Sequence, residues 1–231
     1  MKLSLVSIHP EFISSYLNFG VFRSAIAHKS CEVEVVNLRD YAIDERGTVD
    51  SRVYGGGDGM LLRPEPLANC VLDLKKNSPE AKVVVPAPGG HSWSAAYAKS
   101  FAEKANHLIL IAGRFAGIDQ RFLDQYADVQ VSVGDFVVSG GELPCLLIAD
   151  SIVRFLPGAL GHQDSANFDS FSSELSGFLE APQYTRPSDF CGHAVPKVLL
   201  SGNHSEIAEW RTNSSRKITE SLRPDLIKSR S

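Results

Sequence analysis

Three glycine-bearing segments are the residues of this sequence best suited to binding a ligand. They are residues 86–90 (PAPGG), 112–117 (AGRFAG) and 134–144 (GDFVVSGGELP), and each follows a run that is typical of a β-strand. Glycine lets main-chain N–H and C=O groups approach a ligand closely, so such segments can bind it through the backbone. Each segment alone could be a simple turn, whereas three at consecutive strand ends favour a ligand site.

Other common site types are not indicated. None of the segments matches the GxGxxG pattern of dinucleotide-binding folds or the glycine–lysine pattern of a phosphate-binding loop. The four cysteines are scattered, with no CxxC pair or histidine at ligand spacing, which argues against a zinc site or a disulfide framework and fits a reducing cytoplasm. The N-terminal apolar run stops at His9 and is too short for a signal peptide or a membrane span, so no membrane partner is expected.

Three further features carry reactive or ligand-binding residue types. Residues 54–60 (YGGGDGM) form an expected loop that could cover a flat substrate or serve only as a connector. Arg154 lies in an apolar helical stretch, where its charge needs a partner or an anionic ligand. Asp169 lies in a polar stretch, where a lone aspartate is usually a turn residue or a helix cap. Nothing in the pattern alone brings Arg154 and Asp169 together.

The elements that would position these residues alternate between strands and helices. Apolar, β-branched runs predict strands at residues 3–8, 33–37, 82–86, 107–112 and 128–133. Helical patterns cover residues 11–17, 21–27, 66–74, 94–104, 118–126 and 143–155. This alternation predicts an α/β fold whose sheet is largely parallel, with helices on both faces. Ligands of such sheets bind beyond the carboxyl ends of the strands, where the glycine segments are expected.

The last third of the chain has a different character. Residues 161–183 are polar and serine-rich and predict a linker that could lack structure without a partner. Helical pieces are expected at 205–211 and 224–228. The net charge is −4, yet residues 186–231 hold eight Lys and Arg against five Asp and Glu. Such a basic end on an acidic body can contact phosphates or be only a solvated surface.

The sequence resembles the bacterial tRNA (guanine-N1)-methyltransferases, a family of the SPOUT superfamily. The matching segments cover nearly the whole chain in the family's order and are residues 7–12 (SIHPEF), 48–61 (TVDSRVYGGGDGML), 112–119 (AGRFAGID), 133–144 (VGDFVVSGGELP), 150–162 (DSIVRFLPGALGH), 184–187 (YTRP), 195–204 (VPKVLLSGNH) and 207–211 (IAEWR).

The resemblance implies a fold and an assembly. The implied fold is α/β, with a deep trefoil knot in a mostly parallel sheet that has helices on both faces, plus a small helical C-terminal domain. Knots are exceptions to the rule of unthreaded connections, and no pattern in the sequence itself indicates one. The implied domains are a cofactor-binding domain at residues 1–160, a linker at 161–186 and a tRNA-binding domain at 187–231. The family works in the cytoplasm as an obligate homodimer with active sites between subunits, where the linker becomes ordered when substrate binds.

The resemblance also implies a reaction, methyl transfer from S-adenosylmethionine to N1 of guanine 37 of tRNA, next to the anticodon, which maintains the reading frame. Asp169 matches the general base that removes the N1 proton, and Arg154 matches the residue that stabilises charge on O6. The implied cofactor-binding residues are Pro88, Gly90, Gly113, Val133, Gly134, Asp135, Phe136, Val137, Val138, Gly140, Gly141 and Pro144. The implied tRNA-binding residues are Tyr54, Gly55, Gly56, Gly57, Gly59, Met60 and Arg114.

The sequence departs from the family pattern at a few positions. Ala116 and Phe168 stand where the family usually has acidic residues that are candidates for holding Mg²⁺, so metal dependence is left open and no metal ligand is predicted. About three extra residues lie between Phe171 and Pro182, which leaves Glu180 as the counterpart of a family aspartate. Neither Asp169 nor Arg154 is affected.

Two other functions remain open. The chain could be a SPOUT enzyme that acts on another RNA or another base atom, although the residue 54–60 loop and the SGNH segment argue against it. It could instead be a non-catalytic module that binds S-adenosylmethionine and holds RNA. The absence of acidic residues at Ala116 and Phe168 motivates this alternative.

Overall fold

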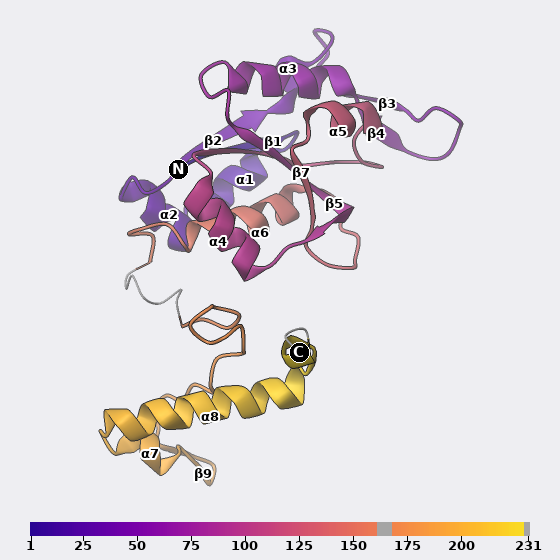
Figure 1. Ribbon diagram of the computed structural model, residues 1–231. Coiled ribbons are helices and arrows are strands. Elements are labelled where there is room, and N and C mark those ends of the chain that lie inside the picture. The colour runs from indigo at the N-terminus through magenta and orange to yellow at the C-terminus, as the bar shows by residue number, and fades with distance from the viewer. Residues whose placement is uncertain (161–167, 229–231) are drawn as a thin grey trace. The chain divides into compact units, whose positions relative to one another are not determined.

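The computed structural model describes residues 1–160 and 168–228, and the chain divides into two compact units, Met1–Gln163 and Asp164–Ser231 (Figure 1). The first unit is built on a five-stranded sheet in the order β2-β1-β6-β5-β7. Its strands are β1 (Lys2–Ser7), β2 (Glu32–Asn37), β5 (Lys82–Ser92), β6 (His107–Ile111) and β7 (Val129–Ser132). Every neighbouring pair is parallel, which confirms the predicted α/β class with a parallel central sheet.

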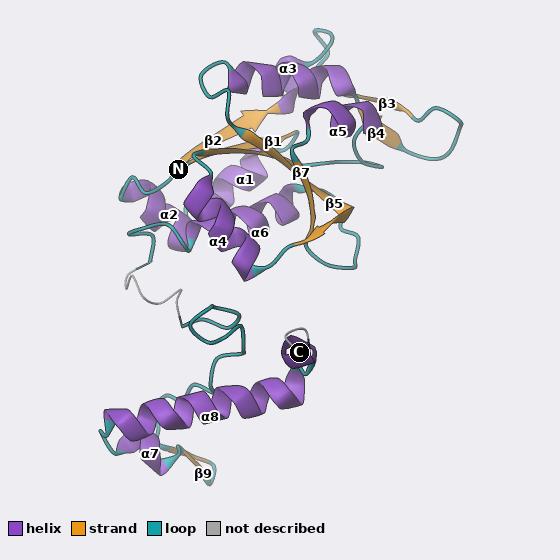
Figure 2. Ribbon diagram, in the orientation of Figure 1, coloured by secondary structure: helices purple, strands orange, loops and turns teal. Residues whose placement is uncertain are grey.

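Helices cover both faces of this sheet (Figure 2). Alternate residues of a strand point to opposite faces, and in β6 Leu108 and Leu110 pack on one side while Ile109 and Ile111 pack on the other. The first side is covered by α1 (Pro10–Leu17), α2 (Gly20–Ala27), α4 (Ala95–Lys104) and α6 (Glu142–Val153). The second is covered by α3 (Pro64–Lys75), α5 (Gln120–Tyr126) and the short 3₁₀ helix η1 (Leu38–Tyr41).

Local side-chain chemistry explains where several helices begin. Ser94 is the N-cap of α4, as its sequence position suggests, and its Oγ accepts a hydrogen bond from the N–H of Tyr97 at 3.2 Å. Asp119 caps α5, so this helix begins at Gln120 rather than at the expected residue 118. Helix α3 begins two residues before the expected position because Pro64, which has no N–H to lose, suits a first helical position.

A short hairpin that the sequence analysis missed carries the glycine-rich loop. It is formed by β3 (Asp50–Arg52) and β4 (Met60–Leu62), which pair antiparallel. Gly55, Gly56 and Gly57 all have positive φ between these strands, a backbone conformation that other residues adopt at a cost. Strands of three residues are too short to show a two-residue period, so no pattern marked them.

The second unit is organised around α8 (His204–Leu222), with α7 (Lys197–Leu200), α9 (Asp225–Lys228) and a hairpin of β8 (Asp189–Phe190) and β9 (His193–Ala194). Helix α8 is much longer than the expected piece at 205–211. Its buried face includes Ser215 and Thr219, whose hydroxyls bond the backbone C=O and N–H of Leu179. A polar buried face gives no apolar period, which explains the underestimate.

The expected linker is partly described. Residues 161–167 lie outside the described residues, whereas residues 168–183 belong to the second unit, where Leu179 bonds Ser215 and Thr219 of α8. Within the part of the chain that the structure describes, no helix combines the length and apolar character needed to cross a membrane. The domain limits expected from the sequence stay a prediction.

Candidate functional site

A hollow lies at the carboxyl-terminal edge of the sheet, where the segments that follow β6 and β7 meet the far part of β5. It is lined by residues 86–88, 113–117, 131–134, 136–141 and Pro144. Ten of the twelve residues expected to bind a cofactor are in this lining, namely Pro88, Gly113, Val133, Gly134, Phe136, Val137, Val138, Gly140, Gly141 and Pro144. The lining does not include Gly90 or Asp135, and the role of all twelve stays a prediction.

The first segment lies within a strand, not after one. Pro86 and His91 both pair with Val131, so residues 87–90 bulge out of β5 before the pairing resumes. A Cβ on Gly90 would lie 2.5 Å from the carbonyl carbon of Gln130, which leaves no room for a side chain. The expectation that this strand ends at residue 86 is therefore wrong, because the strand continues to Ser92 through a glycine-dependent bulge.

The loops after β6 and β7 are packed backbone against backbone. The N–H of Gly141 donates to the carbonyl of Gly113 at 2.7 Å, and Arg114 forms a β-bridge with Gly140. A Cβ on Gly141 would lie 2.5 Å from the backbone nitrogen of Gly113. Because side chains are excluded from this contact, main-chain groups form much of this wall of the hollow.

A buried carboxylate lies behind this wall. Glu142, in the first turn of α6, is 4% exposed and accepts a hydrogen bond from the Ser7 hydroxyl at 2.8 Å. Its other oxygen lies 3.5 Å from an Nη1 of Arg114, a residue that lines the hollow. The sequence analysis did not single out Glu142 or Ser7. The one available signal was an acid at the end of a glycine segment, where a helix N-terminus favours negative charge.

The glycine-rich hairpin is fixed beside the hollow by its base. The N–H of Ala116 donates to the carbonyl of Met60 at 2.8 Å, and the N–H of Leu62 donates to the carbonyl of Gly117 at 3.0 Å. Ala116 and Gly117 both line the hollow. The expected tRNA-binding residues divide here, since Arg114 lines the hollow while Tyr54, 95% exposed, lies in the loop between the two strands.

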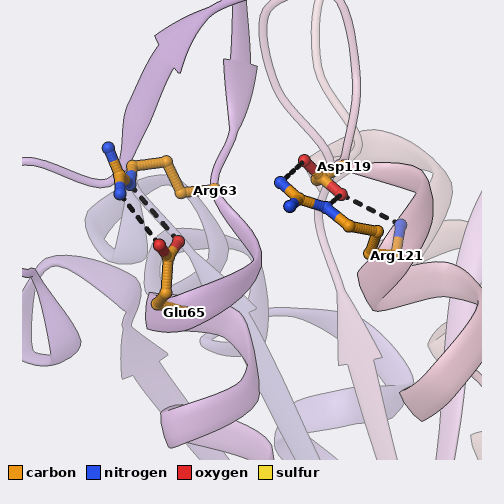
Figure 3. A network of polar contacts seen from close by, with 4 residues as sticks. All are labelled: Arg63, Glu65, Asp119 and Arg121. Atoms are coloured by element: carbon orange, nitrogen blue, oxygen red, sulfur yellow. Dashed lines mark hydrogen bonds and ion pairs between the residues drawn. The ribbon is translucent and has the colours of Figure 1, made fainter.

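Two arginines beside this hairpin are held by neighbouring carboxylates (Figure 3). Arg63 lies 2.9 Å from Glu65, and Arg121 contacts both carboxylate oxygens of Asp119 at 2.9 and 2.8 Å. These contacts lower the pKa of both carboxyl groups. All four residues line a shallow groove together with Tyr54. Their positive charge is therefore largely balanced within the protein.

An apolar groove adjoins the hollow. Its lining includes Phe12, Phe19, Leu143 and Leu147, whose side chains are 45%, 71%, 56% and 53% exposed. Val133, Phe136, Val138 and Pro144 line both the groove and the hollow. So large an exposed apolar surface is typical of a contact with another molecule.

The two residues expected to be catalytic belong to different units. Arg154 is the half-buried C-cap residue of α6 in the first unit. Asp169 is half-buried in a turn of the second unit, where its carbonyl accepts a hydrogen bond from the N–H of Ser172. Their roles stay predictions. Among the described residues, no group of three or more His, Cys, Asp or Glu side chains could hold a metal ion.

Comparisons with known proteins agree on one family. Residues 1–229 match the family described as tRNA (Guanine-1)-methyltransferase TrmD. Proteins named tRNA (guanine-N(1)-)-methyltransferase are similar along their length. The one from Alcanivorax borkumensis is 46% identical over 99% of this chain and 86% of its own. Those from Listeria welshimeri and Geobacter sulfurreducens are 43% and 41% identical, over 99% and 98% of this chain and 92% and 91% of their own.

Proposed function

This chain belongs to the tRNA (guanine-1)-methyltransferase family, and we propose that it transfers the methyl group of S-adenosylmethionine to N1 of guanine 37 of tRNA, next to the anticodon. Family membership makes it a methyltransferase that acts on guanine in tRNA. The donor, the position and the residue roles go beyond membership. The observation that supports the donor is the hollow that the three glycine segments form together, whereas the position and the residue roles rest on the residues that match the family.

The hollow fits S-adenosylmethionine by the chemistry of its walls. Backbone groups around Gly113 and Gly141 can bond polar edges of the adenosine, while Pro88 and Val137 offer apolar contact to its ring. The close approach of Gly141 to Gly113, where a Cβ on Gly141 would lie 2.5 Å from the Gly113 nitrogen, keeps main-chain groups at this wall. When bound, this cofactor supplies an electrophilic methyl group.

Asp169 would act as the general base. Guanine N1 carries a proton at neutral pH and is a poor nucleophile, so the proton has to leave for N1 to attack a methyl group. A carboxylate positioned beside N1 can accept it, and such proton transfer typically contributes roughly 10²–10⁴-fold.

Arg154 would balance the charge that this step creates. Removal of the N1 proton moves negative charge onto O6, and a guanidinium placed there stabilises it. Arg114 lines the hollow and is paired with Glu142, so it can contact the substrate from the cofactor side. No metal ligand is assigned, since Ala116 and Phe168 replace the family's acids.

We also propose that the protein works in the cytoplasm as a homodimer with its active sites between subunits, and that its first unit contains the trefoil knot of SPOUT enzymes. The apolar groove supports the dimer, because a second copy seated there would remove Phe19 and Leu147 from water. The backbone contact between Gly141 and Gly113 supports the knot, because it joins the two loops that the knot would involve. The proposed role in maintaining the reading frame follows from methylation of guanine 37, because this base lies next to the anticodon.

The decisive experiment compares wild type with Asp169→Ala. Wild type should methylate an unmodified tRNA transcript and lose this activity when guanine 37 is replaced by adenine. Asp169→Ala should lower single-turnover transfer by at least about 100-fold while S-adenosylmethionine binding, measured by calorimetry, stays within about twofold. Asp189→Ala, an exposed acid of the same unit, serves as the matched control.

Two outcomes would replace the proposal. Undiminished transfer to the substituted transcript would identify an enzyme that acts on another base. Binding of S-adenosylmethionine by wild type without transfer to any tRNA, with or without Mg²⁺, would identify a non-catalytic module.

A further inference from the structure

The second unit contains a hollow of its own, here called the C-terminal hollow. Tyr184 and Arg186 line it from the segment before β8, and Trp210 and Arg211 line it from α8. The centroids of the Tyr184 and Trp210 rings are 6.2 Å apart, with the ring planes at 58°. Tyr184 is about half exposed, so part of its ring is open to a ligand.

The arginines of this hollow differ from the other arginines that the structure describes in the second unit. Arg216 lies 3.0 Å from Glu220, and Arg223 lies 2.7 Å from Asp225. Among the described residues, neither Arg186 nor Arg211 forms an ion pair with a carboxylate, although both are exposed. Near the glycine-rich hairpin, Arg63 and Arg121 are likewise paired with carboxylates (Figure 3). The C-terminal hollow thus offers two guanidinium groups whose charge is not balanced nearby.

We propose that the C-terminal hollow binds one nucleotide of the RNA substrate, with its base against Tyr184 and Trp210 and its phosphate against Arg186 and Arg211. The inference rests on the proposed function, because it takes tRNA as the partner. Aromatic rings stack on any base, and guanidinium groups bond phosphate oxygens through paired N–H donors. An acidic peptide would need the arginines but would leave the half-exposed tyrosine ring without a stacking partner.

The first test measures the charge. Full-length Arg211→Gln and Arg186→Gln should each bind an unmodified tRNA transcript roughly tenfold more weakly, and the slope of log Kd against log salt should fall by about one. Arg216→Gln is the matched control, because it removes the same charge from an exposed position of the same helix. Its affinity should stay within about twofold of wild type. Equal loss in Arg216→Gln would overturn the proposal in favour of general charge attraction.

The second test measures the stacking. Tyr184→Ala should weaken tRNA binding roughly fivefold to tenfold, and Tyr184→Phe, which keeps the ring, should restore it. The chain has two tryptophans, so Trp93→Phe leaves Trp210 as the only one, and tRNA should quench its fluorescence. Quenching by adenosine monophosphate but not by tRNA would assign the hollow to a free nucleotide and overturn the proposal.

The outcomes separate this inference from the proposed function. If Arg186→Gln, Arg211→Gln and Tyr184→Ala all methylate guanine 37 and bind tRNA with normal affinity, the C-terminal hollow does not bind the substrate, while the proposed activity stands. If the wild-type protein neither binds nor methylates tRNA, the proposed function itself is contradicted. S-adenosylmethionine binding by each variant shows that its first unit is folded, and far-ultraviolet circular dichroism shows that α8 is kept.

Discussion

Among the described residues, Glu142 is the only buried carboxylate, and it connects three parts of the first unit. Its partner Ser7 lies 135 positions away in sequence, at the end of β1, and Arg114 lies in the loop after β6. A buried charge is tolerated only when it is paired and hydrogen-bonded, so the end of β1, the loop and the start of α6 are held in register by this side chain.

Removing the Glu142 carboxylate should therefore destabilise the protein. Glu142→Ala leaves the Ser7 hydroxyl without its acceptor and Arg114 without its counter-charge, so we expect a loss of about 2–3 kcal/mol in the free energy of unfolding. Glu142→Gln keeps an acceptor for the Ser7 hydroxyl, so its free energy of unfolding should fall by less than that of Glu142→Ala. Urea denaturation measures both.

Glu220→Ala provides the comparison for Glu142→Ala. It removes an exposed carboxylate paired with Arg216, and such pairs contribute roughly 0–1 kcal/mol. Equal losses of unfolding free energy in Glu142→Ala and Glu220→Ala would mean that the buried contacts of Glu142 stabilise the protein no more than an exposed ion pair does.

The site could be predicted only in part from the sequence. Gly141 stands out because a Cβ at this position would lie 2.5 Å from the backbone nitrogen of Gly113, so glycine is needed there. Gly90 is needed for the same reason, because its backbone lies against Gln130 and Val131 of β7, but Gly90 itself does not line the hollow. Glu142 was missed because its partners are distant along the chain, and its only local signal was an acid at the end of a glycine segment.

At the scale of elements, the sequence predicts a helix or strand where its buried face is apolar. It fails where the buried face is polar or the element is very short. The strands of the parallel sheet read as apolar runs because helices cover both faces. Helix α8 was underestimated because Ser215 and Thr219 form part of its buried face. The hairpin of β3 and β4 was missed because three-residue strands have no measurable period.

A polar cluster at the other end of the sheet should make stability depend on pH. His107 at the start of β6 is buried, and its Nε2 lies 2.9 Å from the Ser4 hydroxyl of β1, while no group of the described residues bonds its Nδ1. Burial lowers the pKa of His107, with Lys2 lowering it further and Glu34, Glu80 and Glu32 opposing this. Burial therefore favours the neutral form of the imidazole in the folded protein.

The sign of the effect follows from the lowered pKa. The unfolded chain binds a proton at His107 at a higher pH than the folded chain does, so stability is fully present above the ordinary histidine pKa of about 6.5 and is lost as pH falls below it. Chemical denaturation at pH values from about 7.5 to 5.5 should show this loss. His107→Gln should flatten the dependence and the exposed control His28→Gln should not; a dependence unchanged in His107→Gln would contradict the assignment.

For the whole molecule, the division into two units matters most. Arg154 belongs to the first unit and Asp169 to the second, and the apolar groove of the first unit is suited to a second copy. With active sites between subunits, as we propose, we expect Asp169 of one copy to act with Arg154 of the other. Two inactive variants should then complement each other.

Mixing Asp169→Ala with Arg154→Ala tests this directly. After subunit exchange about half of the dimers are mixed, and a two-fold symmetric dimer of this kind has one site with both wild-type residues. The mixture should therefore recover about a quarter of wild-type methyl transfer, because half of the sites in half of the dimers are intact. Mixing two differently tagged Asp169→Ala samples gives the background. A mixture that exchanges subunits, as co-purification of the tags would show, yet stays at background would mean that each site takes both residues from one chain.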